Sequence, residues 1–283
     1  MKKILKSLPP IRWLLDIRRE LALIRFQASR QTRIQQQIFR ELITQRNEAL
    51  GKPFPATHEH QTYSQNGEDG IIQEILRRLG NGSEYFVEIG SGDGLENNTR
   101  MLLELGWKGL WLDGDEKNCS NGKWENSQFV KSGALTIKQT IVTAQNINEI
   151  LRNDCKESLD IFSLDVDLNT YHVWEAIRKV DARIVVLEYN GFFPAEADWI
   201  SEHQPDGWWE GGIQMGASLQ SLTALSKQKG YRLVGCDLSG TNAFFVREDL
   251  AVEHFPKSGN PNLHFEPARP FLLNNPEHRR DLS

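Results

Sequence analysis

The strongest chemical signal in the sequence is a glycine-rich turn that follows a short apolar run. Residues 85–94 are Tyr-Phe-Val-Glu-Ile-Gly-Ser-Gly-Asp-Gly, so Glu88 stands just before three alternating glycines, Gly90, Gly92 and Gly94. Glycine permits positive φ angles and lets the backbone approach a ligand closely. Open α/β sheets bind ligands at the carboxyl ends of their strands, where this turn is expected. The pattern therefore predicts a ligand site; the alternative is an ordinary turn between a strand and a helix.

The spacing of the glycines argues against a dinucleotide site. A dinucleotide fingerprint is Gly-x-Gly-x-x-Gly, which places a pyrophosphate over a helix N-terminus. Here the spacing is one residue tighter, and the acid Glu88 precedes it. An anion beside a pyrophosphate is unfavourable, whereas the same anion suits a ligand that carries a cationic amino group.

A second acid ends the next apolar run. Asp113 closes residues 109–113, Gly-Leu-Trp-Leu-Asp, and Asp115 follows it after one glycine. A carboxylate at that place can accept hydrogen bonds from both hydroxyls of a ribose. The alternative is that either acid caps the following turn. Together with the glycine turn, Asp113 predicts a nucleoside ligand, and Asp115 is the second candidate for its ribose.

Two further apolar runs also end in oxygen-bearing side chains. Asp165 and Asp167 follow one run, and Glu188 and Asn190 close another. Hard cations prefer oxygen ligands, and a bound cation lowers the pKa of a hydroxyl that it contacts. We therefore expect Asp165, Glu188 and Asn190, or a set that includes Asp167, to hold Mg²⁺ together with water. An equally supported interpretation is metal-free, with the acids capping helices and hydrogen-bonding a substrate.

His172 is the predicted general base, because imidazole titrates near neutral pH and this residue follows Asp165 by seven positions. The alternative is a structural histidine at the start of a helix, with His203 as the reserve candidate for the base. Residues 191–218 form a long, aromatic-rich connection, and such loops in compact domains are often functional. We expect a substrate pocket there. Its candidate contacts are Asp167, Tyr189, Trp208 and Trp209.

The elements that must position these residues alternate between strands and helices. The predicted strands are residues 85–89, 109–112, 159–164, 184–187, 231–236 and 242–247, and the predicted helices between them include 97–105, 144–153 and 171–180. Strands that alternate with helices form parallel sheets, and the turn between the last two strands suits an antiparallel hairpin. We expect an α/β domain over residues 61–255, a linker over 51–60, and an extended tail with five prolines over 256–283.

The net charge of −5 over 283 residues is the sum of two unlike parts. Residues 1–50 hold eleven Lys or Arg against four acids (+7), which leaves 22 basic and 34 acidic residues (−12) for the rest. An acidic body argues against nucleic-acid binding, which depends on neutralised phosphates. Three distant cysteines fit a reducing compartment, and no run approaches the ~18 apolar residues of a membrane span. We expect a cytoplasmic protein, with a location at the inner face of the membrane as the alternative.

Within the basic arm, residues 1–50, one long helix is predicted over residues 11–47, because this stretch contains no Pro or Gly and is rich in helix formers. An apolar seam runs along it at 3.5-residue steps and is interrupted by Gln31 and Gln35. Such a seam packs on a partner chain or on the body, whereas cations mixed with bulky apolar groups near the start are typical of interfacial helices. The arm is therefore expected to serve homo-oligomerisation or peripheral membrane contact; the alternative is a solvated helix with one buried stripe.

Five segments resemble FkbM-like S-adenosylmethionine-dependent methyltransferases, which are Rossmann-like class I enzymes. These segments are residues 63–70 (Tyr-Ser-Gln-Asn-Gly-Glu-Asp-Gly), 86–94, 106–115, 162–167 and 186–190. The resemblance covers roughly residues 61–250. It implies a seven-stranded, mostly parallel sheet with an antiparallel last strand. Many relatives of this type are associated with surface-glycan or natural-product pathways.

The resemblance also implies roles for individual residues. Glu88, Gly90, Gly92 and Gly94 would hold the methionine part of S-adenosylmethionine (SAM), and Asp113 its ribose. The cofactor cleft would also be lined by Ser64, Gln65, Glu68 and, beside the adenine, Ala144. Asp165, His172 and Glu188 would be catalytic. Relatives often have Gly-Asn-Asp after the Asp-x-Asp motif, whereas this chain has Leu168-Asn169-Thr170, so one carboxylate of that pattern is absent.

These observations predict an enzyme that moves a methyl group from SAM to an oxygen, on a sugar or a glycosylated intermediate. Two other classes of function stay open. An NAD-dependent oxidoreductase or epimerase acting on nucleotide sugars has a compatible fold but a different glycine spacing. A non-catalytic module would use the basic helix to organise an assembly at a membrane.

Overall fold

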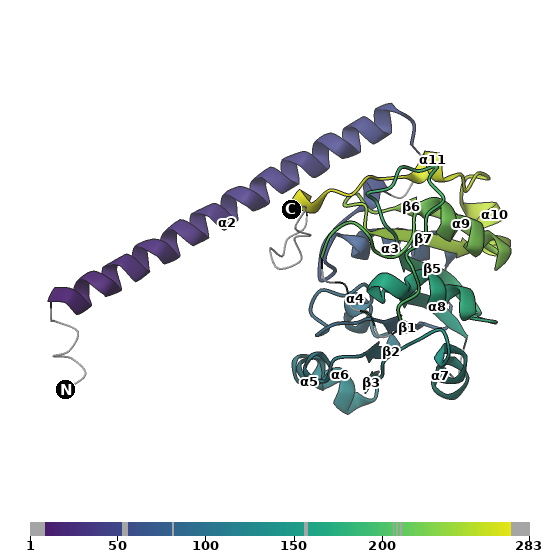
Figure 1. Ribbon diagram of the computed structural model, residues 1–283, viewed down its shortest axis with the longest axis horizontal. Coiled ribbons are helices and arrows are strands. Elements are labelled where there is room, and N and C mark those ends of the chain that lie inside the picture. Colours follow the sequence, from purple (N-terminus) through teal and green to yellow (C-terminus); the bar gives the residue numbers. More distant parts are fainter. Residues whose placement is uncertain are drawn as a thin grey trace. The chain divides into compact units, whose positions relative to one another are not determined.

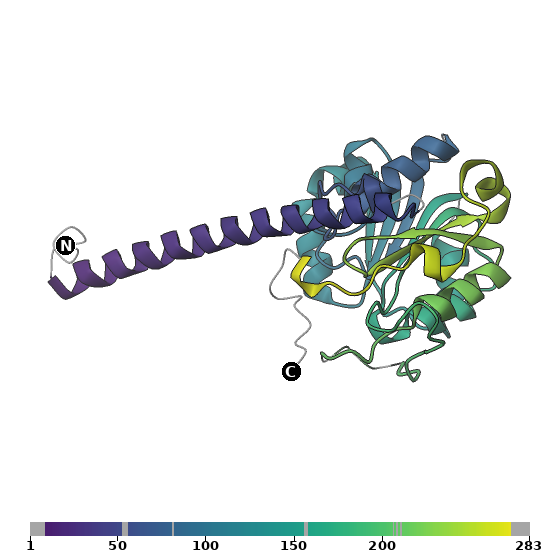
Figure 2. The same ribbon diagram turned by 90° about the horizontal axis from the view of Figure 1, so that it is seen from above.

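The computed structural model describes residues 9–52, 56–80, 82–155, 158–205, 207, 209 and 211–272. It divides into two compact units, residues 1–45 and 46–283. Helix α2 (Pro9–Ala49) is continuous over its 41 residues, as the sequence predicts (Figure 2). Most of this helix belongs to the first unit, and its last turn belongs to the second. Prolines at its first positions suit a helix start, and Gly51 at φ +63° follows its end. Within the described residues, no helix is long and apolar enough to cross a membrane.

The second unit is built on a seven-stranded sheet in the order β3-β2-β1-β4-β5-β7-β6 (Figure 1). Its strands are β1 (Tyr85–Ile89), β2 (Lys108–Asp113), β3 (Leu135–Gln139), β4 (Leu159–Leu164), β5 (Ala182–Glu188), β6 (Tyr231–Cys236) and β7 (Asn242–Arg247). Strands β1 to β5 pair in parallel, and β7 is antiparallel to both β5 and β6. The predicted Rossmann-like sheet with an antiparallel last strand is confirmed.

Strand β3 is the one strand that the sequence does not predict. Its residues, Leu-Thr-Ile-Lys-Gln, lie at the edge of the sheet and bury only Leu135 and Ile137. A strand that is covered on one face and paired on one side has no continuous apolar run, which is the signal that identifies the other parallel strands.

Helices cover both faces of the sheet and form its two hydrophobic cores. One face packs against α7 (Ile147–Asp154), α8 (Thr170–Ala176) and α9 (Leu219–Gln228). The other packs against α3 (Glu68–Leu79), α4 (Arg100–Glu104), α5 (Glu116–Glu125) and α10 (Glu248–His254) (Figure 1). The remaining short helices are α6 (Ser127–Ser132), α11 (Pro261–His264) and three 3-10 turns at Ala56–His58, Asp167–Asn169 and Pro270–Leu272. Neighbouring strand residues such as Phe86 and Val87 point into opposite cores.

The tail is more structured than its prolines predict. Residues 256–272 include α11 and a 3-10 turn rather than a uniformly extended chain. They pack on the turns that follow β5 and β6: the backbone N–H of Ala268 donates to the carbonyl of Gly191, and the Tyr189 hydroxyl donates to the carbonyl of the buried Glu266. A side chain at Gly240 would meet the Pro267 carbonyl oxygen at 2.4 Å. The rest of the predicted tail, residues 273–283, lies outside the described residues.

Candidate functional site

A cavity of about 720 Å³ lies at the carboxyl edge of the parallel strands. This volume is within the ~300–1,000 Å³ typical of small-molecule sites. Its walls come from the ends of β1, β2, β4 and β5, the start of α3, the segment after β3, and the long connection between β5 and α9. The sequence-predicted residues that line it are Gln65, Glu68, Glu88, Gly90, Gly92, Asp113, Asp115, Asp165, Asp167, Glu188 and Trp209.

The three glycines of the turn after β1 all have positive φ, for different reasons. A Cβ atom on Gly90 (φ +79°) would lie 1.7 Å from the Asp165 carbonyl oxygen, because the turn crosses tightly over the end of β4. A Cβ atom on Gly94 (φ +74°) would lie 2.6 Å from the buried ring of Trp111. Gly92 (φ +57°) would meet no heavy atom within 4 Å. Gly90 and Gly94 are therefore required by packing, whereas Gly92 leaves space beside the cavity.

Glu88 holds the loop that opens α4. Its carboxylate accepts hydrogen bonds from the side-chain amide of Asn97 (2.7 Å), the backbone N–H of Asn98 (2.8 Å), and the backbone N–H and hydroxyl of Thr99 (3.0 and 2.5 Å). Burial raises the pKa of Glu88 to about 7, against the lowering effect of these hydrogen bonds. The segment Asn97–Thr99, predicted to be helical, is drawn to this acid, so α4 begins at Arg100.

Asp113 joins the glycine turn to the end of β2. One carboxylate oxygen accepts from the backbone N–H of Gly92 at 2.8 Å, and the other accepts from the backbone N–H of Asp115 (2.9 Å) and the side-chain amide of Asn118 (3.3 Å). A carboxylate has about four acceptor positions, so these donors leave about one for a ligand hydroxyl. Asp115 caps α5 by accepting from the Asn118 N–H at 2.7 Å, and it still lines the cavity.

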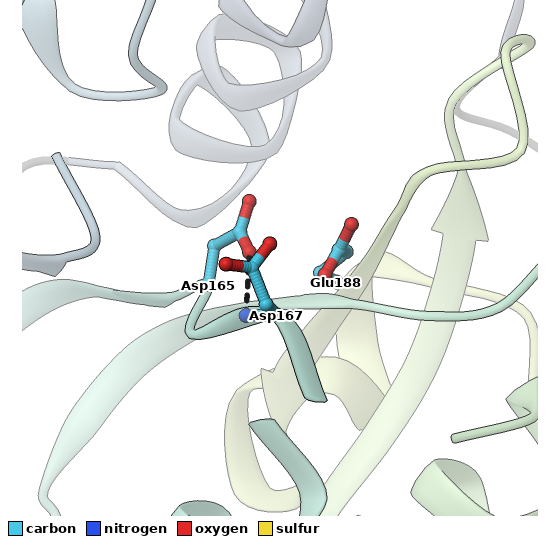
Figure 3. Close-up of side chains that lie close together, drawn as sticks. All are labelled: Asp165, Asp167 and Glu188. Atoms are coloured by element: carbon cyan, nitrogen blue, oxygen red, sulfur yellow. Dashed lines mark hydrogen bonds between the residues drawn. The ribbon is translucent and has the colours of Figure 1, made fainter. Parts of the chain in front are cut away.

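Three carboxylates gather at the centre of the strand edge. Asp165 and Asp167 follow β4, Glu188 ends β5, and one oxygen from each lies within 4.8 Å of the others. Their side chains point to the same side of the sheet edge (Figure 3). Asp167 has φ +48°, an uncommon angle for a residue with a side chain. Glu188 is buried, and the two aspartates are half-buried.

Asn242 adds an amide oxygen on the other side of Glu188. The two residues are paired in register between β5 and β7, so their side chains emerge on the same face of the sheet. The Asn242 amide nitrogen donates to Glu68 at 2.8 Å, whereas no described residue donates to its oxygen. Asn242 is 6% exposed and lines the cavity, so this acceptor faces whatever the cavity holds.

Several sequence-predicted residues lie away from the cavity. The hydroxyl of Ser64 accepts from the backbone N–H of Asp69 at 3.1 Å, so this serine stabilises the start of α3. Tyr189 is buried on the opposite side of the strand, against the tail. Ala144 is displaced from the lining by Thr140–Val142, which form the wall after β3.

The predicted base and one predicted metal ligand have other partners. His172 places Nε2 2.9 Å from the Ser201 carbonyl oxygen, its ring is tilted by 42° against that of His203, and it is outside the residues that line the cavity. The Asn190 amide donates to the carbonyls of Ile213 and Met215, and its oxygen accepts from the Phe192 N–H. Asn190 therefore holds the loop after β5, and Asp167 takes the place expected for it beside Asp165 and Glu188.

Of the two predicted tryptophan contacts, Trp209 lines the cavity and Trp208 lies outside the described residues. Trp209 donates through Nε1 to the Gly212 carbonyl at 3.2 Å. Lining residues that the sequence did not indicate include Ser91, Asn97, Asn118, Thr140–Val142 and Asn242, whereas Met215 lines the cavity from within the predicted pocket segment, residues 191–218. Ser91, Asn97 and Asn118 follow the predicted strands β1 and β2, and a search past the ends of those strands would have found them, whereas Thr140–Val142 follow β3, which the sequence does not predict. Asn242 begins β7, and only the sheet order brings it beside Glu188.

No protein-family model and no curated protein matches this sequence. Among solved structures, the N-terminal domain of EvdMO1 with SAH bound is similar at 13% identity and a TM-score of 0.43, over 73% of this chain and 94% of that one. The glycopeptide N-methyltransferase MtfA complexed with SAM is similar at 14% identity and a TM-score of 0.39, over 68% and 98%. TrmK of M. capricolum in complex with S-adenosyl-homocysteine (SAH) is similar at 11% identity and a TM-score of 0.39, over 62% and 65%. At these sequence identities and TM-scores, neither the ligands nor the reactions of these proteins are assigned to this chain.

Proposed function

We propose that this chain is an FkbM-like methyltransferase that transfers the methyl group of SAM to a hydroxyl of a sugar or a glycosylated intermediate. The observation that carries the proposal is one cavity shared by the glycine turn, Asp113 and the acid cluster of Asp165, Asp167 and Glu188. The first two features suit a nucleoside with an amino-acid end, and the cluster suits the activation of a hydroxyl.

The cofactor would lie across the ends of β1 and β2. The open space at Gly92 lets its methionine part approach the turn, and the buried Ser91 hydroxyl, which has no partner among the described residues, offers it a hydrogen bond. The remaining acceptor position of Asp113 and the carboxylate of Asp115 would receive the ribose hydroxyls. Thr140–Val142 would form the wall beside the adenine.

The transfer needs little chemistry from the protein, because the sulfonium of SAM is already an activated leaving group. The acceptor oxygen forms a bond to the methyl carbon, the carbon–sulfur bond breaks, and its electron pair stays on sulfur. The hydroxyl proton goes to a carboxylate of the Asp165, Asp167 and Glu188 cluster, which faces the cavity. His172 lies outside the lining and takes no part in this scheme.

The cluster also fits Mg²⁺, because it offers hard oxygen donors within 4.8 Å of one another and an adjacent acceptor, Asn242 Oδ1. Asp165, Asp167 and Glu188 would hold the ion. Bound there, the ion would lower the pKa of the acceptor hydroxyl. The same carboxylates and the indole of Trp209 suit a sugar, which has hydroxyl rims and apolar C–H faces.

Isothermal titration calorimetry tests the cofactor assignment. The protein should bind SAH at one site and should not bind NAD⁺. Asp113→Ala should weaken SAH binding by about ten-fold or more, whereas Asp181→Ala, an exposed acid at the amino end of β5, should not. A folded protein that binds neither SAM nor SAH would refute the proposal, and NAD⁺ binding would favour the oxidoreductase.

A second experiment tests the reaction. Saccharides incubated with SAM and the protein should gain a methyl group by mass spectrometry, and Asp165→Asn should abolish that gain while SAH still binds. Unchanged methylation by this variant would remove the cluster from the reaction. SAH binding without methylation of any hydroxyl acceptor, in the presence of Mg²⁺, would favour the non-catalytic module.

A further inference from the structure

Helix α2 exposes a row of large apolar side chains in two stretches, separated by Ala28, Gln31 and Gln35. Along one side, Leu14, Leu21, Ile24, Ile38 and Leu42 have 58, 50, 59, 51 and 54% of their surface exposed. Monomeric proteins rarely expose an apolar surface of such extent, so a row of this kind marks an interaction surface.

The row keeps a single heptad register along the helix, with glutamines at three of its positions. Alternating steps of three and four residues place Leu14, Leu21, Ala28, Gln35 and Leu42 at a positions, and Ile17, Ile24, Gln31, Ile38 and Gln45 at d positions. A repeat of 3.5 residues sustained over more than four heptads is the pattern of a left-handed coiled coil, in which a and d side chains of two helices interlock.

The residues at the e and g positions, which flank the row, indicate which partner helix covers it. In a parallel coiled coil of two identical helices, each g residue meets the e residue of the next heptad on the partner. The resulting pairs are Trp13 with Arg18, Glu20 with Arg25, Gln27 with Thr32, Ile34 with Phe39, and Glu41 with Arg46. Two pairs join opposite charges, one places a cation beside an indole, one is apolar and one is neutral, so none brings like charges together.

The same residues disfavour other partners. In an antiparallel pair of helices, e positions face e positions and g positions face g positions. The glutamates at the g positions would then lie apart from the arginines at the e positions, so no ion pair would form between them. An interfacial membrane helix buries its apolar face in the lipid, and Gln31 and Gln35 place two polar amides in the middle of this one. In an in-register parallel pair, each glutamine amide meets its own copy and can both donate and accept a hydrogen bond.

We propose that α2 forms a parallel, in-register, two-stranded coiled coil with α2 of a second copy of this chain, over residues 14–45. The protein is then a homodimer whose two sheet-bearing units are attached at the same end of the coil. This inference rests on α2 alone and is independent of the proposed function.

Charge reversal with heterodimer rescue tests the pairing. The full-length chain should have the mass of a dimer by light scattering after gel filtration. Glu20→Arg with Glu41→Arg, or Arg25→Glu with Arg46→Glu, should each weaken dimerisation by about ten-fold or more, because each turns attractive g–e pairs into repulsive ones. An equimolar mixture of the two variants should restore the dimer. Arg19→Glu with Arg33→Glu changes exposed f positions, on the side away from the seam, and should leave the dimer intact.

Cross-linking tests the register. Ile24→Cys, at a d position, should form a disulfide with its own copy under oxidising conditions, whereas Leu23→Cys, on an exposed c position, should not. The thermal unfolding of the sheet-bearing unit should be unchanged in all variants, which separates lost pairing from misfolding. A wild-type monomer at tens of micromolar, a mixture that fails to restore the dimer, or α2-dependent binding of monomers to anionic vesicles would overturn the proposal.

Discussion

Replacing Gly92 by alanine should separate ligand binding from folding. An L-residue in the left-handed region costs about 1–2 kcal/mol. Gly92 (φ +57°) and Gly133 (φ +76°) both lie in that region, and a Cβ atom on either would meet no heavy atom within 4 Å. Both alanine variants should therefore lose about 1–2 kcal/mol of unfolding free energy, measured by urea denaturation.

The two variants differ in what the new methyl group faces. Gly92 lines the cavity, whereas Gly133 ends α6 and is absent from the lining. In calorimetry, Gly92→Ala should bind SAH at least about ten-fold more weakly than wild type, a loss of about 1.4 kcal/mol, and Gly133→Ala should bind normally. Gly90→Ala should fail to fold, because its Cβ would lie 1.7 Å from the Asp165 carbonyl oxygen. Equal SAH affinities for Gly92→Ala and Gly133→Ala would refute this account of the turn.

Four further predictions follow from the site and its supports. Mg²⁺ should raise the melting temperature of the wild type but not of Asp167→Asn, measured by calorimetric scans; equal shifts would exclude the cluster. His172→Ala should methylate at the wild-type rate, because the ring binds a backbone carbonyl outside the cavity lining. Between pH about 4.5 and 7 the folded state retains a proton on Glu88 that the unfolded chain releases, so its contribution to stability falls by up to about 3 kcal/mol as pH rises. Urea curves of Glu88→Gln should lack that slope. Glu266→Ala should cost about 3 kcal/mol in the same assay, because this buried acid pairs with cations.

The sequence was sufficient for the parts of the fold with a strong local signal. Apolar runs identified four of the strands, and the hairpin turn between residues 236 and 242 identified two more. The glycine turn has the predicted positive φ angles. Helix limits were less predictable because they depend on distant partners. Asn97–Thr99 are diverted from the predicted helix by hydrogen bonds to Glu88, a residue nine or more positions earlier.

Side-chain direction explains where the site prediction diverges from the structure. Glu188 points into the cavity, so the next residue along the extended chain, Tyr189, points to the opposite side, where its hydroxyl meets the tail. Asn190 lies beyond the strand and is held by carbonyls from residues 213 and 215, which are distant in sequence. The alternation of strand side chains could have excluded Tyr189, whereas the partners of Asn190 and His172 follow only from the path of the loop after β5.

In the metal-free interpretation, the acids of the cluster cap helices and hydrogen-bond a substrate. The geometry of the cluster tests the first of these two roles. The residues at the N-cap positions of the 3-10 turn at 167–169 and of α8, Val166 and Asn169, make no side-chain cap hydrogen bond. Asp165 Oδ1 accepts from the backbone N–H of Asp167, the first residue of that turn, at 3.5 Å (Figure 3), and Asp167 occupies neither N-cap position. Two ionised carboxylates whose oxygens lie within 4.8 Å of each other repel by roughly 3 kcal/mol or more at an effective dielectric constant of 20, and the left-handed backbone of Asp167 adds about 1 kcal/mol. A helix cap at this place would require neither the charge repulsion nor the left-handed backbone, because one acid is enough to cap a helix. A cation, or a substrate that donates several hydroxyls, offsets both, and this favours a ligand at the cluster over a purely structural role.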